Sequence, residues 1–391
     1  MGPELTHLRH PIRAAKVAKA LVAERWNMWR FVDRGQRHFA RDARYDLRSV
    51  TKGFTPRIDN RSSDTTLLDR ICTSYCKAAK LQESAPDTFR ATEWWERQRR
   101  RRLKPAIEAL MNHDISAVGR MYQNFYRDPC SAGLIVGQRQ AKRYFGETFK
   151  DFHRRLYLID ALYRIDYWKA RTGGSFALGD LSGPSIGNPF GVEIDGTLVR
   201  AGAEFQHFCA HRISDLLDSG PATVAEIGGG FGGMAYYLLR DRPRTTYVDF
   251  DVPESIALTS YYLLKAFPEL TVLLYGEEEM TRESISRADV VLMPAFELAK
   301  MPAACADVTF SSHAMSDLSQ EAMIDYLGHI AHMTRDCFFY IGNGLSGKAI
   351  SDLVVRQYPL LRLSETRPSG WHDHRIQDAG EVECLYRICG P

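Results

Sequence analysis

The sequence predicts an α/β fold in which a helical N-terminal region precedes a Rossmann-like sheet of seven strands. Three observations predict this fold. From about residue 220 onward, short apolar runs alternate with helical patterns, as in parallel, doubly wound sheets. The first of these runs leads into a glycine-dense loop, and a helical pattern follows it directly. Before residue 170, apolar residues recur at helical spacing.

Helices are expected over 12–32, 66–82, 91–112 and 138–170. The third of these segments carries five arginines in six residues, Arg97 and Arg99 to Arg102. No aromatic residues are interleaved with these arginines, as they are in many nucleic-acid sites. We therefore expect a solvated helix face or an oligomer contact, and no nucleic-acid partner.

The segment 171–200 is dense in glycine, proline and serine, and it divides the chain. Within it, two short β-type runs flank Asp195-Gly196, a dipeptide that favours the tight turn of a β-hairpin. We expect a mostly helical region over 1–170 that serves oligomerisation or covers the substrate. A linker with a hairpin over 171–200 and the α/β domain over 201–391 should follow.

The α/β domain should begin with a helix over 202–218. The strand candidates that follow are five to seven residues long, and helical patterns separate most of them. The expected strands are 223–228, 245–250, 271–275, 289–293, 307–311, 337–342 and 382–388.

The net charge of +3 conceals an asymmetry between the two halves of the chain. Residues 1–170 hold 34 Lys and Arg against 19 Asp and Glu, which gives +15, and residues 171–391 hold 17 against 29, which gives −12. The basic half could attract an anionic substrate, but docking of the halves, within one chain or between subunits, is favoured. We expect a homodimer.

The sequence also indicates where in the cell the protein is expected to reside. No apolar run approaches the roughly 20 residues that a membrane helix needs, and the first residues lack a signal-peptide pattern. The eight cysteines form no paired CxxC motifs, which is typical of thiols in a reducing cytosol. We expect a cytoplasmic protein with no membrane partner.

The glycine loop carries the strongest functional signal. Five of the six residues from Gly228 to Gly233 are glycine, and such a loop lets the chain turn tightly or lets a ligand approach the backbone. Its spacing satisfies the dinucleotide pattern GxGxxG, which is weak evidence alone. Glu226, two residues earlier, suits a ligand with an ammonium and a sulfonium group better than a pyrophosphate. Asp251, at the tip of the next strand, could hold two ribose hydroxyls.

At these residues the chain resembles a known family. The stretches EIGGGFGGMA and FDVPE are similar to the first motif and the second-strand tip of class I S-adenosylmethionine (SAM) methyltransferases. With PFGVEIDGTLV, SYYLLKAFP and YRDPCSAGLIVG added, the chain resembles bacterial sugar O-methyltransferases over roughly residues 120–345. The resemblance implies SAM as the cofactor, S-adenosylhomocysteine (SAH) as its product, and a sugar or glycoside as the acceptor.

The resemblance also implies a set of cofactor residues. The methionine end of SAM should contact Glu226 and the glycine loop, the ribose should contact Asp251, and Val252 should pack on the adenine. A polar residue after the third strand, Glu277 or Glu278, should reach the adenine rim. The implied cofactor site comprises Glu226, Gly228, Gly229, Gly230, Asp251, Val252, Glu277 and Ser312.

A hydroxyl acceptor needs a general base, and histidine suits this role near neutral pH. His313 follows the strand expected over 307–311, with Asp317 four residues later, a layout similar to that of small-molecule O-methyltransferases. The alternative is GWHDHR, in which His372 and His374 would share one face if extended and could supply a base or two metal ligands. The sequence therefore leaves open whether the protein uses a divalent metal ion.

The acceptor should contact residues outside the expected sheet. The stretches YRDPCSAG and GNPFGVEIDG are expected to cover the site. Arg127 and Asn188 are candidates for hydrogen bonds to the acceptor, and Phe190 and Trp371 are candidates for its aromatic walls.

The sequence thus predicts a SAM-dependent O-methyltransferase acting on a hydroxyl of a sugar or glycosylated metabolite, in natural-product or polysaccharide biosynthesis. Three alternatives remain. The acceptor could be a phenol or a peptide, the chain could be a binding protein that keeps the fold without the chemistry, or it could be an NAD-linked oxidoreductase.

Overall fold

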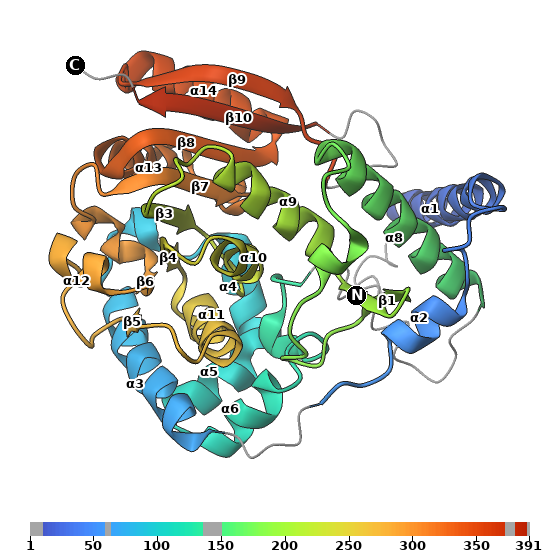
Figure 1. Cartoon of the computed structure of the whole chain (residues 1–391), viewed down its shortest axis with the longest axis horizontal. Coiled ribbons are helices and arrows are strands. Elements are labelled where there is room, and N and C mark those ends of the chain that lie inside the picture. The colour runs from blue at the N-terminus through green and yellow to red at the C-terminus, as the bar shows by residue number, and fades with distance from the viewer. Residues whose placement is uncertain (1–10, 59–63, 136–150, 372–379, 389–391) are drawn as a thin grey trace.

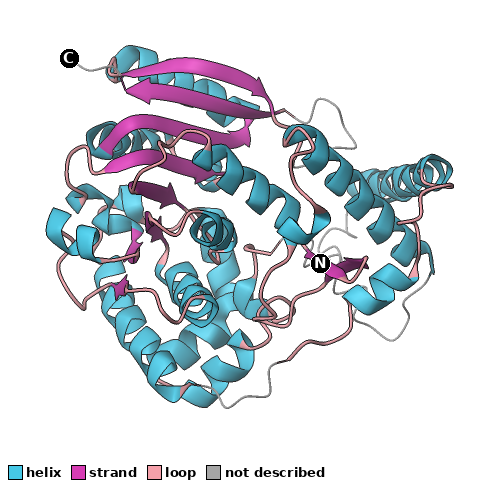
Figure 2. Ribbon diagram, in the orientation of Figure 1, coloured by secondary structure: helices cyan, strands magenta, loops and turns pink. Residues whose placement is uncertain are grey.

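The computed structural model describes residues 11–58, 64–135, 151–371 and 380–388. Within these ranges, a large twisted sheet lies among helices on both of its faces (Figure 1). Helices predominate before residue 172, and strands alternate with helices after residue 221 (Figure 2). The α/β, Rossmann-like fold class predicted from the sequence is confirmed.

The main sheet has eight strands in the order β5-β6-β4-β3-β7-β8-β10-β9. The pairs from β5 to β8 are parallel, and β10 runs antiparallel to both of its neighbours. The strands are β3 (Ala222–Ile227), β4 (Thr245–Asp251), β5 (Val272–Leu274), β6 (Val290–Pro294), β7 (Ala306–Ser312), β8 (Thr334–Asn343), β9 (Leu361–Pro368) and β10 (Glu381–Ile388).

Each of the seven strands expected from the sequence overlaps an observed strand, whereas β9 is not predicted. This strand lies at the edge of the sheet, and Leu361 is its one buried residue. A solvated edge strand can be polar along most of its length. The stretch LRLSETRP therefore lacks the apolar run by which the other strands are recognised.

The strands bury both faces of the sheet against separate hydrophobic clusters. Consecutive residues of β3 illustrate this division, because Val224 belongs to one cluster and Ala225 to the other. The first cluster includes side chains from the helical segments 11–38, 65–82, 151–171, 203–214, 233–241 and 253–266, and the second includes side chains from the helical segments 282–287, 320–333 and 344–357. The helices of the N-terminal region therefore extend the core on one face of the sheet.

Helices are present in the expected segments 12–32, 66–82 and 202–218, and the segment 91–112 is divided between two helices and a π-helical turn; of the segment 138–170, residues 138–150 lie outside the described residues. Within the described ranges, no helix is long and apolar enough to cross a bilayer. The helices are α1 (Pro11–His38), α2 (Arg48–Gly53), α3 (Thr65–Gln82), α4 (Glu93–Gln98), α5 (Lys104–Met111), α6 (Ile115–Tyr122), α8 (Asp151–Arg171), α9 (Ala203–Ser214), α10 (Gly233–Asp241), α11 (Pro253–Ala266), α12 (Arg282–Arg287), α13 (Gln320–Met333) and α14 (Gly344–Gln357).

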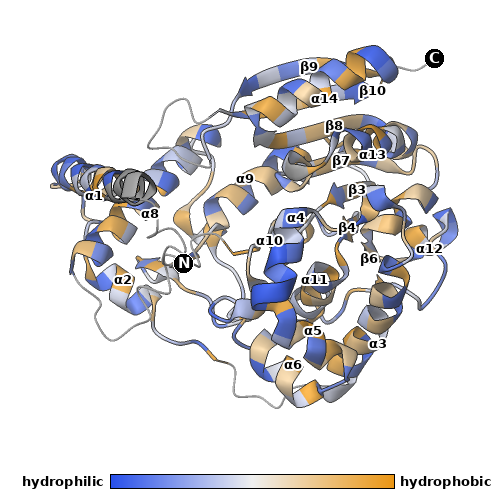
Figure 3. Cartoon of the chain, turned by 180° about the vertical axis from the view of Figure 1, so that it is seen from behind, coloured by the Kyte–Doolittle hydropathy of each residue, from blue (hydrophilic) through white to orange (hydrophobic). Residues whose placement is uncertain are grey.

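The arginine-rich segment forms a π-helical turn, Arg99–Leu103, between α4 and α5. Arg97, Arg100 and Arg101 are exposed, and hydrophilic residues dominate this part of the surface (Figure 3). Arg99 differs from them, because its Nε donates to Glu254 Oε1 on α11 at 2.5 Å. The segment is thus partly a solvated face and partly a contact with the α/β domain.

The basic N-terminal region docks on the acidic C-terminal region within the chain. In addition to the Arg99–Glu254 pair, Arg70 of α3 donates to both carboxylate oxygens of Glu277, at 2.6 and 2.9 Å. Arg171, at the end of α8, donates to Glu383 of β10 at 2.8 Å. These contacts satisfy part of the charge asymmetry inside one protomer.

The hairpin predicted at Asp195-Gly196 is present as β1 (Gly191–Ile194) and β2 (Thr197–Arg200). Both turn residues have positive φ, 49° and 77°, as the tight hairpin turn requires. The order of the main sheet reverses at β3, because the chain runs outward through β4 and then returns to β7 on the other side of β3. Ligands of such sheets bind at the carboxyl ends of the strands flanking this reversal.

Candidate functional site

The glycine loop leaves β3 at this reversal and enters α10. Gly228, Gly230 and Gly232 have φ values of 80°, 68° and 84°, a region that residues with a side chain rarely adopt. Space also excludes side chains. A Cβ on Gly228 would overlap that of Ala314, and a Cβ on Gly229 would lie 2.6 Å from the Tyr247 hydroxyl. The density of glycine thus follows from backbone conformation and from close neighbours.

Three carboxyl groups lie under the loop, on β3 and β4. The Glu226 side chain is 3% exposed and Asp249 is fully buried, whereas Asp251 at the strand tip is partly exposed. Asp249 Oδ1 accepts the Gly229 amide at 3.0 Å, and Asp251 Oδ2 accepts the Gly230 amide at 2.9 Å. The two β4 carboxyls therefore fix the loop from below. Asp251 and the loop glycines are brought together as the sequence predicts.

Burial raises the pKa of each of these carboxyls. It raises the pKa of Glu226 to about 8, although the hydrogen bond from Tyr247 opposes the shift. It raises the pKa of Asp251 to about 7, against hydrogen bonds from the amides of Val252 and Gly230. The pKa of Asp249 is raised as well, by burial and by the charge of Asp251.

Among the described residues, no lysine or arginine donates a hydrogen bond to Glu226, Asp249 or Asp251. When these carboxyls are ionised, no basic side chain of the described residues neutralises their charge through a direct hydrogen bond. Such a cluster is stabilised by protons or by a cationic ligand.

His313 follows β7, the other strand at the reversal of the sheet. Its backbone has φ 63° and ψ −22°, a left-handed conformation that is uncommon for a residue with a side chain. The amide of His313 donates to the Ile341 carbonyl at 2.8 Å, which ties the turn to β8. The side chain is 39% exposed, so its ring can meet a ligand.

The His313 ring has a polar partner at each nitrogen. Nε2 lies 2.5 Å from Glu381 Oε1, and Nδ1 lies 2.9 Å from the Ser312 hydroxyl. Glu381 is almost fully buried, and its second oxygen accepts the Trp371 amide at 2.9 Å. With Glu381 ionised, Nε2 carries the proton and Nδ1 is the unprotonated, basic nitrogen.

One carboxylate beside His313 comes from Glu381, a residue that the sequence analysis does not single out. Asp317 is the last residue of the short helix Ala314–Asp317, and its side chain is not among those described. Glu381 lies 68 residues away from His313, at the start of β10. Only the antiparallel pairing of β10 with β8 brings it near, and no local motif marks that pairing.

The glycine loop and His313 are close neighbours. The Ser311 hydroxyl donates to the Ile227 carbonyl at 3.0 Å, and Ala314, which follows His313, lies against Gly228. Ser312 contacts the His313 ring. The structure thus brings the expected base and the glycine loop to one edge of the sheet.

An aromatic wall beside His313 was only partly anticipated. The ring of Phe205, in the first turn of α9, lies 6.0 Å from that of His313. The ring centre of Trp371 lies 5.5 Å from that of Phe205. Trp371 is only 3% exposed, because it also packs against Phe208 and Tyr167. Trp371 supports this wall from behind. Phe205 lies in an ordinary amphipathic helix, so no pattern in the sequence marks it.

The other three candidates for acceptor contacts lie together in a buried junction. Phe190 is fully buried and packs on Phe54. Asn188 Oδ1 accepts the Arg57 amide at 2.7 Å, and Arg127 Nε donates to the Asn188 carbonyl at 3.0 Å. Burial lowers the pKa of Arg127 to about 10. In the structure these side chains join the hairpin to the N-terminal helices.

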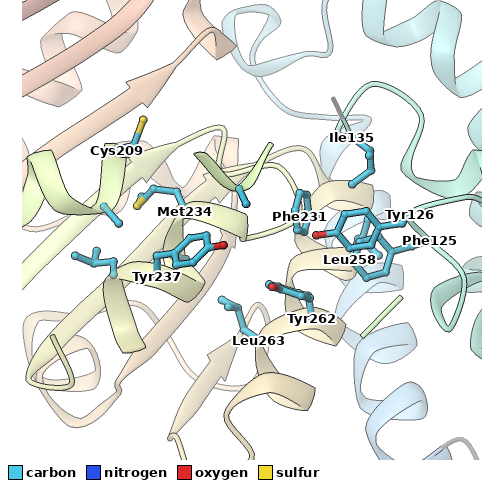
Figure 4. Packing of buried hydrophobic residues seen from close by; sticks show 14 of the residues in the cluster. Phe125, Tyr126, Ile135, Cys209, Phe231, Met234, Tyr237, Leu258, Tyr262 and Leu263 are labelled. Carbon is cyan, nitrogen blue, oxygen red and sulfur yellow. The ribbon is translucent and has the colours of Figure 1, made fainter. Parts of the chain in front are cut away.

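The stretch that contains Arg127 nevertheless approaches the glycine loop. Phe125 and Tyr126 contact Phe231, the one residue of the loop with a side chain, at ring distances of 5.5 Å (Figure 4). The Leu134 side chain lies 3.9 Å from the position of a Cβ on Gly230. This stretch of the chain therefore packs against the glycine loop.

The remaining cofactor candidates occupy different places. Val252 caps α11 and donates its amide to Asp251 Oδ1 at 2.7 Å. Glu277 follows the edge strand β5 and pairs with Arg70, and Glu278 pairs with Arg287. The strand beside β4 is β6 rather than β5, so residues after Pro294 lie nearer to Asp251.

His372 and His374 lie outside the described residues. Among the residues that are described, no group of three or more histidine, cysteine or acidic side chains is placed to hold a metal ion.

Neither a protein-family model nor a curated protein sequence matches this chain. Among solved structures, it is similar to the mitomycin 7-O-methyltransferase MmcR, with 18% identity over 49% of this chain and 56% of MmcR and a TM-score of 0.34. It is also similar to the magnesium protoporphyrin IX methyltransferase ChlM from Synechocystis PCC 6803 with bound SAM, with 7% identity, coverages of 65% and 92%, and a TM-score of 0.36.

A SAM-dependent methyltransferase from Aquifex aeolicus gives 11% identity, coverages of 48% and 93%, and a TM-score of 0.34. The chain spans 56% of the length of both MmcR and LaPhzM. Identities and TM-scores this low carry no conclusion about activity, which must be argued from the site itself.

Proposed function

We propose that this protein is a SAM-dependent O-methyltransferase that methylates a hydroxyl of a sugar or a glycosylated small molecule. The observation that carries the proposal is the proximity of two groups at the reversal of the sheet. One is the buried carboxyl cluster, to which no lysine or arginine of the described residues donates a hydrogen bond. The other is the partly exposed His313 ring, whose Nε2 is hydrogen-bonded to Glu381.

The carboxyl cluster fits a cationic ligand. SAM carries an ammonium group and a sulfonium group, and when bound it supplies an activated methyl group. Glu226 lies under the glycine loop, where it can accept from the ammonium group. Each Asp251 oxygen accepts one backbone amide and keeps a lone pair for a ribose hydroxyl.

The same geometry argues against a dinucleotide. A pyrophosphate is held by free amide donors of a glycine loop. Here the amides of Gly229 and Gly230 already donate to Asp249 and Asp251. Carboxylates at these positions would also repel the phosphates. An NAD-linked reaction is therefore disfavoured.

The His313–Glu381 pair fits a general base. Glu381 holds the ring through Nε2, so Nδ1 can take a proton from an acceptor hydroxyl, and Glu381 stabilises the imidazolium that results. In the structure Ser312 donates to this nitrogen. An acceptor hydroxyl would take the place of the Ser312 hydroxyl. The sugar or glycoside class of the acceptor rests on the sequence resemblance, and Phe205 offers a ring for it to pack against.

Two measurements test the proposal. Calorimetry should show SAH binding with a Kd in the micromolar range, about −8 kcal/mol, and no binding of NADH. Transfer of an isotopically labelled methyl group from SAM should occur to members of a panel of sugars and glycosides, and not to phenols or peptides. SAH binding without transfer to any acceptor would favour a binding protein that lacks the chemistry.

Asp251→Ala should weaken SAH binding by about tenfold or more, because it removes the acceptors for two ribose hydroxyls and frees the Gly230 amide. Glu277→Ala is the matched control. This carboxylate pairs with Arg70 on the edge strand, so its removal should leave the SAH Kd within about twofold of the wild-type value. Equal losses in the two calorimetric titrations would contradict the assignment of the ribose site to Asp251.

A further inference from the structure

Tyr247 belongs to the carboxyl cluster, although no sequence motif marks it. Alternate residues of a strand point to the same side, so Tyr247 and Asp249 share one face of β4. Glu226 pairs directly with Asp249 in the register of β3 and β4. The Tyr247 hydroxyl donates to Glu226 Oε2 at 2.5 Å, and the tyrosine is fully buried.

The titratable groups around Glu226 would otherwise disfavour its charged form. Asp249 and Asp251 face it from β4, and the Cys209 thiol of α9 is within electrostatic range. The loop above contributes no titratable side chain. Tyr247 therefore supplies the side-chain hydrogen bond that favours an ionised Glu226 in a cluster of acids.

We propose that Tyr247 is a positioning residue of the cofactor site, which orients the Glu226 carboxyl toward the ammonium group of the ligand and allows the cluster to release a proton when the ligand binds. The inference rests on the proposed function, because it takes SAM and SAH as the ligands. Tyr247 acts through its hydrogen bond to Glu226, and its hydroxyl lies beneath the glycine loop.

The sign of the coupling follows from the ionisation of Glu226. Below a pH of about 8 the carboxyl of the empty site is mostly protonated, since burial raises its pKa to that value. A bound ammonium group favours the carboxylate, so binding releases a proton, and affinity rises as pH rises toward 8. Loss of the Tyr247 hydroxyl would raise the pKa of Glu226 further and move the rise in affinity to higher pH.

The experiment is calorimetry with SAH from pH 6 to pH 9, in pairs of buffers that differ in their heat of ionisation. Wild-type protein should release a proton on binding at pH 7. Tyr247→Phe should bind SAH about tenfold more weakly at pH 7, because the charged form of Glu226 loses one hydrogen bond, and should regain most of this affinity by pH 9. With Glu226→Gln in place, Tyr247→Phe should cause no further pH-dependent loss.

Tyr237→Phe is the matched control. Tyr237 is also fully buried, but its hydroxyl donates at 2.8 Å to the Leu181 carbonyl and has no carboxyl partner. This variant should bind SAH as the wild type does at every pH. The labelled residues of Figure 4 show Tyr237 on α10, beside Met234.

The outcomes distinguish the proposed function from the role of Tyr247 in it. No SAH binding by the wild type would overturn the proposed function, and this inference with it. If the wild type binds SAH and Tyr247→Phe binds equally well at pH 7, the role of Tyr247 alone is overturned. An equal loss at every pH, or binding without proton release, would reduce Tyr247 to a packing residue and would likewise overturn the inference.

Discussion

His313→Ala should lower turnover by about 10²–10⁴, the usual contribution of a positioned general base, and should leave the SAH Kd nearly unchanged. Among the described residues, its ring bonds Ser312 and Glu381, and no hydrogen bond joins it to the carboxyl cluster. The acid limb of the pH–rate profile should disappear, since that limb reports protonation of the imidazole. Steady-state kinetics, once an acceptor is found, and calorimetry with SAH measure the two effects.

Glu381→Gln tests how the base is held. Both oxygens of Glu381 accept, one from His313 and one from the Trp371 amide. A glutamine has one acceptor oxygen and one donor group, so it satisfies one partner and opposes the other. We expect turnover to fall by about 10–10², with SAH binding retained. Full activity in Glu381→Gln would show that this carboxyl does not orient the base.

The histidines of the GWHDHR stretch provide the decisive comparison. If His372→Ala or His374→Ala abolishes turnover and His313→Ala does not, the base or a metal site belongs to that stretch. Treatment with EDTA then separates the two cases. Activity that is lost to the chelator and restored by a divalent ion indicates a metal-assisted hydroxyl, and activity that persists indicates an imidazole base.

The sequence predicts those parts of the structure whose cause is local. The parallel strands are recognised because short stretches with buried apolar residues alternate with helical patterns, and the hairpin is recognised because Asp195 and Gly196 suit positive φ. The glycine loop and Asp251 are predicted to meet because parallel strands end at the same edge of a sheet. The strand β9 is not predicted from the sequence, because an edge strand need not be apolar.

The site residues are likewise predicted where a local pattern marks them and missed where only tertiary packing brings them in. His313 is recognised by its position just past a strand, but its partner Glu381 comes from the antiparallel strand β10, and nothing local specifies that pairing. Phe205 and Tyr247 act through contacts made by tertiary packing. Conversely, Arg127 and Asn188 have the chemistry of a binding site, yet in the structure their side chains bond other groups of the protein in a buried junction.

Gly228→Ala should destabilise the protein and the candidate site together, because this position lies where the glycine loop meets the turn that carries His313. Its φ of 80° costs a residue with a Cβ about 1–2 kcal/mol. The new Cβ would also overlap that of Ala314, which directly follows His313. We expect the free energy of unfolding to fall by about 2–4 kcal/mol and SAH binding to weaken by at least about tenfold, in chemical denaturation and calorimetry.

Two further variants divide this effect into its causes. Ala314 is the one residue whose atoms a Cβ at 228 would meet, so Gly228→Ala with Ala314→Gly should recover the steric part and keep the backbone strain of about 1–2 kcal/mol. Gly220→Ala is the control, since this glycine has no positive φ and open space at its Cβ position, and its stability should change little. If the double variant is no more stable than Gly228→Ala, the loop and the His313 turn do not meet at these two residues. Recovery of stability would show that Gly228 and Ala314 are in close contact and that this contact holds the His313 turn against the glycine loop.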